Sequence, residues 1–192
     1  RITTTVYDAL YRRVAKIDPL GNRNTTVYDL NNRAVATINP LGNRTTTVFD
    51  AAGQSNATID PLGARSTVVY DAAGRTLATV DPMARRTTYA YNANSNRVRS
   101  TDPLGSITTT VYDADGKTVA TIDPLLRRTT QVYDLAGRAV ATVNANGFRT
   151  TMVYDAAGRS AASVSPLSQR MTTVYDKASR TIASVNPLAQ RN

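Results

Sequence analysis

The feature that most constrains this chain is a tandem repeat with a period of 21 residues. All eight Pro occupy one slot of the repeat, and Ala145 stands in that slot in the remaining copy. All ten Gly occupy two slots. Chains with a fixed period of this kind bury their core by stacking one repeat on the next. An aromatic residue followed by Asp or Asn marks each of the nine copies: Tyr7-Asp8, Tyr28-Asp29, Phe49-Asp50, Tyr70-Asp71, Tyr91-Asn92, Tyr112-Asp113, Tyr133-Asp134, Tyr154-Asp155 and Tyr175-Asp176.

We therefore interpret residues 1–192 as one array of nine units, without an internal domain boundary. Both ends fall at the same phase of the repeat, and neither shows an atypical capping unit that would shield a terminal edge. We expect the chain to be a window of a longer array, or a subunit whose ends other chains cover.

Two turn signals divide each unit. The first, the tyrosine turn, is the five-residue segment that follows the aromatic, as in Asp71-Ala72-Ala73-Gly74-Arg75, where Asp can cap a type I turn and Gly can take the left-handed position. The second, the proline turn, begins with Asp-Pro-Leu-Gly, as in residues 60–63. The segments between the turns are rich in Thr, Val, Ile and Tyr, which favours strands. The pattern predicts one β-hairpin per repeat.

A parallel solenoid with one coil per repeat is the alternative arrangement. It would stack the Asp of the tyrosine turn in a like-charged column about 4.8 Å apart, whereas antiparallel hairpins double this spacing. Hairpins also bring Asp8 near Arg12 and Asp60 near Arg65 across their turns. We favour hairpins, and we expect about 18 strands in one antiparallel sheet, which is too wide to lie flat. The predicted fold is all-β, a winding sheet that forms the wall of a superhelical tube or hollow shell.

Composition argues against enzymatic activity. The chain lacks His, Cys, Glu and Trp, and all 14 acids are Asp. The common general bases, thiol nucleophiles and most transition-metal ligands are therefore missing. The Asp lie in turn slots where capping explains them, although Asp and Asn turns can also offer oxygen ligands to calcium. We predict no catalytic residue, no cofactor and no metal site.

The formal charge of +9 is carried mainly by Arg in two slots. We name the first set the turn arginines: Arg12, Arg33, Arg75, Arg138, Arg159 and Arg180. We name the second set the strand arginines: Arg23, Arg44, Arg65, Arg86, Arg128, Arg149 and Arg170. A structural role, in which guanidinium groups bond to nearby Asp and turn carbonyls, is favoured over a polyanion-binding stripe. The surplus charge leaves room for weak binding of a polyanion or acidic glycan.

We expect the aromatic column to pack in a core, between layers or against cross-strand neighbours, and not to stack on sugars or bases. Nothing indicates specific nucleic-acid binding. The chain has no run of about 18 apolar residues, so the sequence predicts no membrane span. The first residues show no secretion signal.

The repeat resembles the YD, or Rhs, repeats of bacterial polymorphic toxins, of the shell component of insecticidal Tc toxin complexes, of wall-associated proteins and of teneurins. Residues 69–77 and 153–159 carry the signature, and the likeness covers the whole chain, with weaker copies at Tyr7 and Tyr91. The resemblance implies a spiral of hairpins around a hollow shell, which in toxin members encloses a C-terminal effector. These repeats are more uniform than those of family shells, which favours an open tube or fibre over a closed shell.

The sequence thus predicts a non-enzymatic structural segment of an extracellular or cell-surface tube, filament or shell. It would associate with itself or continue into further repeats. Two alternatives remain: part of a toxin-encapsulating shell around another polypeptide, and an adhesin that binds acidic glycans through its Arg and Tyr slots. Three groups of residues are expected to carry the repeat structure. They are the aromatic residues at positions 7, 28, 49, 70, 112, 133, 154 and 175, each with the Asp that follows it; Tyr91; and the turn pairs Gly74-Arg75, Gly137-Arg138 and Gly158-Arg159.

Overall fold

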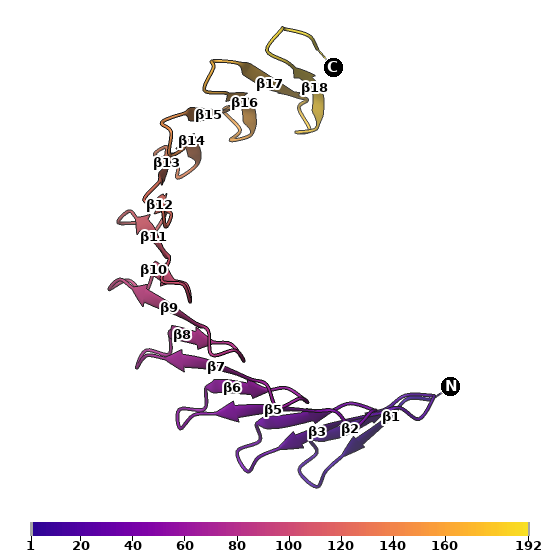
Figure 1. Ribbon diagram of the computed structural model, residues 1–192. Helices are drawn as coiled ribbons and strands as arrows, with labels where there is room; N and C mark the ends of the chain where they lie inside the picture. Colours follow the sequence, from indigo (N-terminus) through magenta and orange to yellow (C-terminus); the bar gives the residue numbers. More distant parts are fainter. Residues whose placement is uncertain (1, 192) are drawn as a thin grey trace. The chain divides into compact units, whose positions relative to one another are not determined.

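The computed structural model describes residues 2–191, and within this range all regular secondary structure is β (Figure 1). Each repeat contributes a longer strand that ends in the aromatic residue and a shorter strand that begins after the tyrosine turn. The predicted fold class, an all-β chain of tandem 21-residue hairpins, is confirmed. The winding of the sheet into a tube or shell stays a prediction.

The chain divides into two compact units, and we describe each by itself. Unit 1 comprises Arg1–Ala90 with Thr101–Gly105, and unit 2 comprises Tyr91–Ser100 with Ser106–Asn192. The strands of the first half are β1 (Thr4–Tyr7), β2 (Arg13–Ile17), β3 (Arg23–Tyr28), β4 (Ala34–Ile38), β5 (Arg44–Phe49), β6 (Ser55–Ile59), β7 (Arg65–Tyr70), β8 (Thr76–Val80) and β9 (Arg86–Tyr91). Those of the second half are β10 (Arg97–Thr101), β11 (Ile107–Tyr112), β12 (Thr118–Ile122), β13 (Arg128–Tyr133), β14 (Ala139–Val143), β15 (Arg149–Tyr154), β16 (Ser160–Val164), β17 (Arg170–Tyr175) and β18 (Thr181–Val185).

Within each unit, consecutive strands pair antiparallel. In unit 1, β3 pairs with β4 through Val27 and Ala36, and β4 pairs with β5 through Ile38 and Arg44. In unit 2, β13, β14 and β15 repeat this register. The pairing thus follows the hairpin arrangement and not the parallel solenoid.

A β-bulge follows every tyrosine turn for which the pairing is described. Val27 pairs with Ala36 but Tyr28 pairs with Ala34, so Val35 is an extra residue on the shorter strand. The same shift recurs in β7–β8 of unit 1 and in β15–β16 of unit 2. A bulge bends its strand and increases the local right-handed twist. Because the bulge has the same place in each repeat, every hairpin receives the same local twist.

Both turns of the repeat have the same backbone design. In the tyrosine turn, the N–H of Gly74 donates to the Asp71 carbonyl and the N–H of Asp71 donates to the Arg75 carbonyl, at 3.0 and 2.9 Å. The proline turn makes the same two bonds between Gly63 and Asp60 and between Asp60 and Ala64. Each turn is therefore a three-residue hairpin loop in which a type I turn is followed by a left-handed residue.

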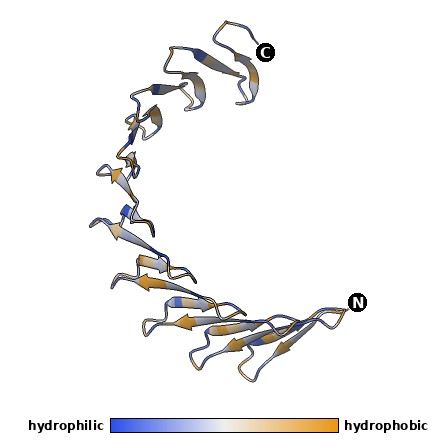
Figure 2. Cartoon of the chain, viewed as in Figure 1, coloured by the Kyte–Doolittle hydropathy of each residue, from blue (hydrophilic) through white to orange (hydrophobic). Residues whose placement is uncertain are grey.

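The buried core is one alanine in each of eight repeats. The residues that are at most 5% exposed are Ala15, Ala36, Ala57, Ala78, Ala120, Ala141, Ala162 and Ala183. Figure 2 shows hydrophobic and hydrophilic bands alternating along the strands of both units. No other described residue is buried, which means that each unit is a single layer of sheet and no second layer of this chain covers it. The fifth repeat departs from the pattern because the exposed Arg99 occupies the alanine slot.

Candidate functional site

The tyrosine turn is closed by its Asp. In the first repeat, Asp8 Oδ1 accepts the N–H groups of Leu10 and Arg12, each at 2.9 Å. Asp8 Oδ2 accepts from Arg12 Nε at 2.7 Å. One carboxylate therefore satisfies two backbone donors and one guanidinium group, which fixes both the turn and the direction of the Arg side chain.

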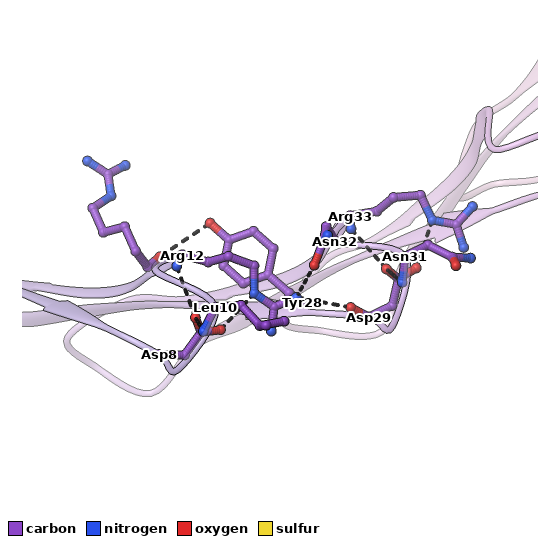
Figure 3. Close-up of polar contacts among 9 residues, drawn as sticks. Asp8, Leu10, Arg12, Tyr28, Asp29, Asn31, Asn32 and Arg33 are labelled. Carbon is purple, nitrogen blue, oxygen red and sulfur yellow. Dashed lines mark hydrogen bonds and ion pairs between the residues drawn. The ribbon is translucent and has the colours of Figure 1, made fainter.

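The same Arg then reaches the next repeat, as Figure 3 shows. Its guanidinium carbon lies 4.8 Å from the centroid of the Tyr28 ring. Its Nη1 donates to the Asp29 carbonyl at 3.2 Å and to Asn32 Oδ1 at 2.8 Å. Arg12 thus joins two consecutive tyrosine turns through an ion pair on its own turn and three contacts on the next.

We call this arrangement the Asp–Arg–Tyr ladder, and it recurs in both units. Arg33 lies 4.6 Å from the ring centroid of Phe49 in unit 1. In unit 2 the corresponding distances are 4.7 Å for Arg138 over Tyr154 and 4.6 Å for Arg159 over Tyr175. Arg159 Nη1 also donates to the Asp176 carbonyl at 3.1 Å. The regular geometry indicates that the ladder is the principal side-chain link between neighbouring repeats.

The tyrosine hydroxyl adds a second link. Tyr28 Oη donates to the Arg13 carbonyl at 3.2 Å, and Tyr70 Oη donates to the Ser55 carbonyl at 2.9 Å. Tyr154 makes the same bond to the Ala139 carbonyl in unit 2, also at 2.9 Å. Each hydroxyl therefore bonds to the start of the preceding repeat's shorter strand. This bond gives the Tyr column a structural role although the rings do not enter a core.

Three repeats have an altered ladder. Gln54 and Asn96 replace the turn arginine, and Lys117 takes its place in the sixth repeat. The Lys117 ammonium lies farther from its ring, at 5.9 Å from the Tyr133 centroid. The aromatic hydroxyl bond persists after both uncharged replacements, because Tyr70 and Tyr112 still donate to the Ser55 and Arg97 carbonyls.

The left-handed residue of the tyrosine turn lies under the preceding repeat's ladder side chain. A Cβ atom built on Gly158 would lie 3.6 Å from Arg138 Nη1, and one on Gly74 would lie 2.8 Å from Gln54 Nε2. Where the slot holds a polar residue, that residue accepts from the ladder: Ser179 Oγ accepts from Arg159 Nη1 at 3.2 Å. The slot thus serves both the backbone turn and the contact between repeats.

The ladder lowers the pKa of its carboxylates. For Asp8, Asp29, Asp71, Asp134, Asp155 and Asp176, the largest cause of the lowered pKa is the backbone N–H of the residue four positions on. The guanidinium group of that residue lowers the pKa further. It acts through a hydrogen bond in all six pairs and also through its charge in at least five of them. Partial burial raises the pKa and so opposes both effects. These acids stay ionised in the folded chain under conditions in which a free Asp begins to protonate.

The strand arginines behave differently from the turn arginines. The expected approach of Asp60 to Arg65 is not made, because Arg65 pairs with Ile59 and Ala64 is the residue opposite Asp60. Within residues 2–191, no ion pair involves a strand arginine, and every member is exposed. The structural interpretation therefore fits the turn arginines, and the strand arginines remain a row of exposed cations.

The Asp residues act as turn caps. Thirteen of the 14 accept a backbone N–H in one of the two turns, and Asp115 lies 3.6 Å from Lys117 Nζ. Over the described range, no three acidic, His or Cys side chains gather where they could hold a metal ion. The same range contains no helix that is long and apolar enough to cross a membrane.

The structure places the predicted repeat residues in two roles. The aromatic residues end the longer strands, and the Asp, Gly and Arg residues build the tyrosine turns. Sequence reasoning missed the contact between a turn arginine and the aromatic residue of the next repeat, although the two lie 16 residues apart throughout. A signal was present: the non-Gly residues of the left-handed slot include Asn32 and Ser179, which can accept a hydrogen bond.

The fold and the ladder define a β-hairpin repeat protein in which most neighbouring units are joined by the same side-chain contacts. A family model described as RHS Repeat matches residues 70–109 and 133–170. These two segments therefore match the RHS repeat, and the predicted resemblance to the YD/Rhs repeat family is confirmed.

Solved structures agree on the fold. Crystal structures of TcdB2-TccC3 and of TcdB2-TccC3-TEV match with a TM-score of 0.50 and 15% sequence identity. The match covers 98% of this chain but only 15% of theirs. At this identity the likeness extends to the fold alone. No curated protein sequence matches the chain.

Proposed function

We propose that this chain is a non-enzymatic structural segment, a stretch of wall in an extracellular or cell-surface tube, filament or shell. The observation that carries the proposal is the ladder: outside the repeats with Gln54, Asn96 and Lys117, a turn arginine links its own Asp to the aromatic residue of the next repeat. Because one geometry recurs at most junctions, the array extends without a new kind of interface at each step.

The single layer of sheet supports the same function. Only the alanine column is buried among residues 2–191, so both faces of each unit stay open to their surroundings. A wall separates two spaces and needs two faces, whereas an enzyme needs a concave site that brings polar groups together. The Asp residues are committed to turns, which leaves a structural role as the function they support best.

Electron microscopy of the purified chain tests the proposal. We expect regular filaments or tubes whose subunit repeat reflects the hairpin spacing. Compact closed particles, with no extended assemblies over a range of concentrations, would contradict the filament and favour the second candidate.

That second candidate is a segment of a shell that encloses another polypeptide. The observation in its favour is the fold likeness to TcdB2-TccC3, of which this chain covers 15% of the length. Sequencing the gene on both sides of residues 1–192 distinguishes the candidates. A non-repeat domain that follows the array would support an enclosed polypeptide, and further uniform repeats would support a tube.

A further inference from the structure

The strand arginines differ from one another in their nearest acid. Each is the first residue of a longer strand and pairs with the last residue of the preceding shorter strand, as Arg65 pairs with Ile59. The first residue of the proline turn follows directly after that partner, so a carboxylate there adds negative charge to this end of the hairpin without forming an ion pair with the strand arginine. That residue is Asp in five repeats and Asn39 in the second, and the last three repeats are the one place where consecutive repeats all lack the acid, with Asn144, Ser165 and Asn186.

In these three repeats the neighbouring cations face no acid. Arg149 pairs with Val143, Arg170 pairs with Val164, and Arg191 forms a bridge to Val185. Asn144 Oδ1 and Asn186 Oδ1 accept the turn N–H groups in place of a carboxylate. The turn geometry is thus preserved while its negative charge is removed.

The surrounding charge balance adds to the effect. Residues 144–191 carry six Lys and Arg against two Asp. Both acids, Asp155 and Asp176, form ion pairs at 2.7 Å with the turn arginines Arg159 and Arg180. Arg149, Arg170 and Arg191 are exposed, and none of them has an ion-pair partner within the described part of the chain. We call these three residues the arginine row.

The arginine row has a regular spacing. Its members are separated by one intervening strand each, which places their backbones about 10 Å apart across the sheet. By strand alternation, Thr151 and Thr172 share the face of Arg149 and Arg170. The site is therefore a sheet surface with one guanidinium group at every second strand and hydroxyl groups beside it.

We propose that the arginine row binds a linear acidic polysaccharide that runs across strands β15 to β18. A polysaccharide with one acidic sugar in each disaccharide spaces its charges by two sugar rings, a distance close to the two-strand spacing of the row. Guanidinium groups bind carboxylate and sulfate by paired hydrogen bonds, and Thr hydroxyls bond to sugar hydroxyls. Single-stranded nucleic acid fits less well, because it needs aromatic rings on which bases stack. Here the Tyr175 ring is covered by Arg159 and its hydroxyl is bonded to the Ser160 carbonyl.

Binding of hyaluronan, which carries one carboxylate per disaccharide, tests the proposal. We expect binding at low salt that weakens as salt screens the charges, and a loss of roughly tenfold or more in affinity when Arg149, Arg170 and Arg191 are all changed to Ala. A second variant carries Asn144→Asp, Ser165→Asp and Asn186→Asp. It should also lose affinity, and it should fold normally because Asp occupies this slot at Asp18, Asp60 and Asp123.

The matched control removes three exposed cations elsewhere, through Arg13→Ala, Lys16→Ala and Arg23→Ala, and should retain nearly full affinity. An equal loss in this control would overturn the proposal, because binding would then follow net charge alone. Tighter binding of a single-stranded oligonucleotide than of hyaluronan would overturn it in favour of nucleic acid. Absence of hyaluronan and heparin binding at low salt would also overturn it. Far-UV circular dichroism verifies that each variant is folded.

Discussion

The left-handed residue of each turn shows how closely a single position is specified. In the tyrosine turn, Gly74 has φ +78°, and Asn32 holds the same position with φ 62°. Asn tolerates this conformation because its side chain can bond locally, whereas a β-branched residue clashes with its own backbone. The slot holds Gly, Asn or Ser in eight repeats and Tyr11, with φ 58°, in the first, and in no repeat is it β-branched, so we expect it to resist Val.

Replacing Gly74 with Val should destabilise the chain by about 1 kcal/mol or more. The left-handed backbone strains the β-branched Val. A Cβ at this position would also meet Gln54 Nε2 at 2.8 Å, but Val and Asn share that contact, so the difference between the two variants isolates the backbone strain. Gly74→Asn is the matched control and should cost much less, because Asn32 is native in the equivalent slot. Urea unfolding followed by circular dichroism measures both. Equal stability of the Val variant and the parent would refute the turn assignment.

The ladder carboxylates predict a loss of stability in acid. Their folded pKa lies below the unfolded value, so their contribution is fully present above the unfolded pKa of about 3.9 and is lost as pH falls through the folded pKa. Thermal melts should give a nearly constant Tm down to about pH 5 and a fall below about pH 4. A variant with Asp134→Asn and Asp155→Asn should show a shallower fall, because Asn92 shows that the slot accepts the neutral amide. A Tm that rises on acidification would contradict the assignment.

At the scale of the hairpin, the ladder decides how strongly neighbours are coupled. Gln54 interrupts it between the third and fourth repeats, where Tyr70 keeps only its hydroxyl bond to the Ser55 carbonyl. Asp50 still caps its own turn there through the Gln54 N–H, at 2.9 Å. The components for a complete ladder are therefore in place except for the cation.

Gln54→Arg should stabilise the chain by about 0.5–1 kcal/mol, because the new guanidinium group can pair with Asp50 and lie over the Tyr70 ring, as Arg33 lies over Phe49. Chemical unfolding measures the gain. Gln54→Leu, which offers a side chain without charge, should give none of it. The gain should become smaller when Tyr70→Leu is added, because only the pairing with Asp50 then remains. A gain of unchanged size after this second change would show that the ring takes no part in the coupling.

The local design of the hairpins was predictable from the sequence, and their coupling was not. Asp, Gly and Pro in fixed slots indicate the turns through backbone preferences alone, which act within five residues. The contact of Arg12 with Tyr28 depends on the rotation between successive hairpins, which the bulge at Val14 helps to set. The expected pairing of Asp60 with Arg65 was wrong for a similar reason. The prediction placed them opposite each other across the turn, but the three-residue loop sets a register in which Arg65 pairs with Ile59.

At the scale of the whole molecule, the chain is a one-dimensional array whose stability is a sum over repeats and their junctions. The fifth repeat carries four departures from the common pattern: Asn92 for Asp, Ser95 for Gly, Asn96 for Arg and Arg99 for the buried Ala. The division into two compact units also falls within residues 91–105. Asn92, Asn96 and Arg99 each remove or weaken a stabilising contact found in other repeats, and Ser95 holds a left-handed backbone that Gly adopts with less strain. We therefore expect this repeat to be the weakest in the interior of the array.

Hydrogen exchange should therefore be faster in β10 than in β7 or β13, because a local opening costs least where the fewest contacts are lost. A variant with Asn92→Asp, Ser95→Gly, Asn96→Arg and Arg99→Ala restores the common pattern and should slow exchange in β10, while exchange in β7 and β13 changes little. Mass spectrometry of peptides from each strand measures the three rates in one experiment. Equal protection of β10 in the parent chain would mean that stability is shared across the array as one cooperative unit. The fifth repeat would then be a surface variation and not a boundary between cooperative units.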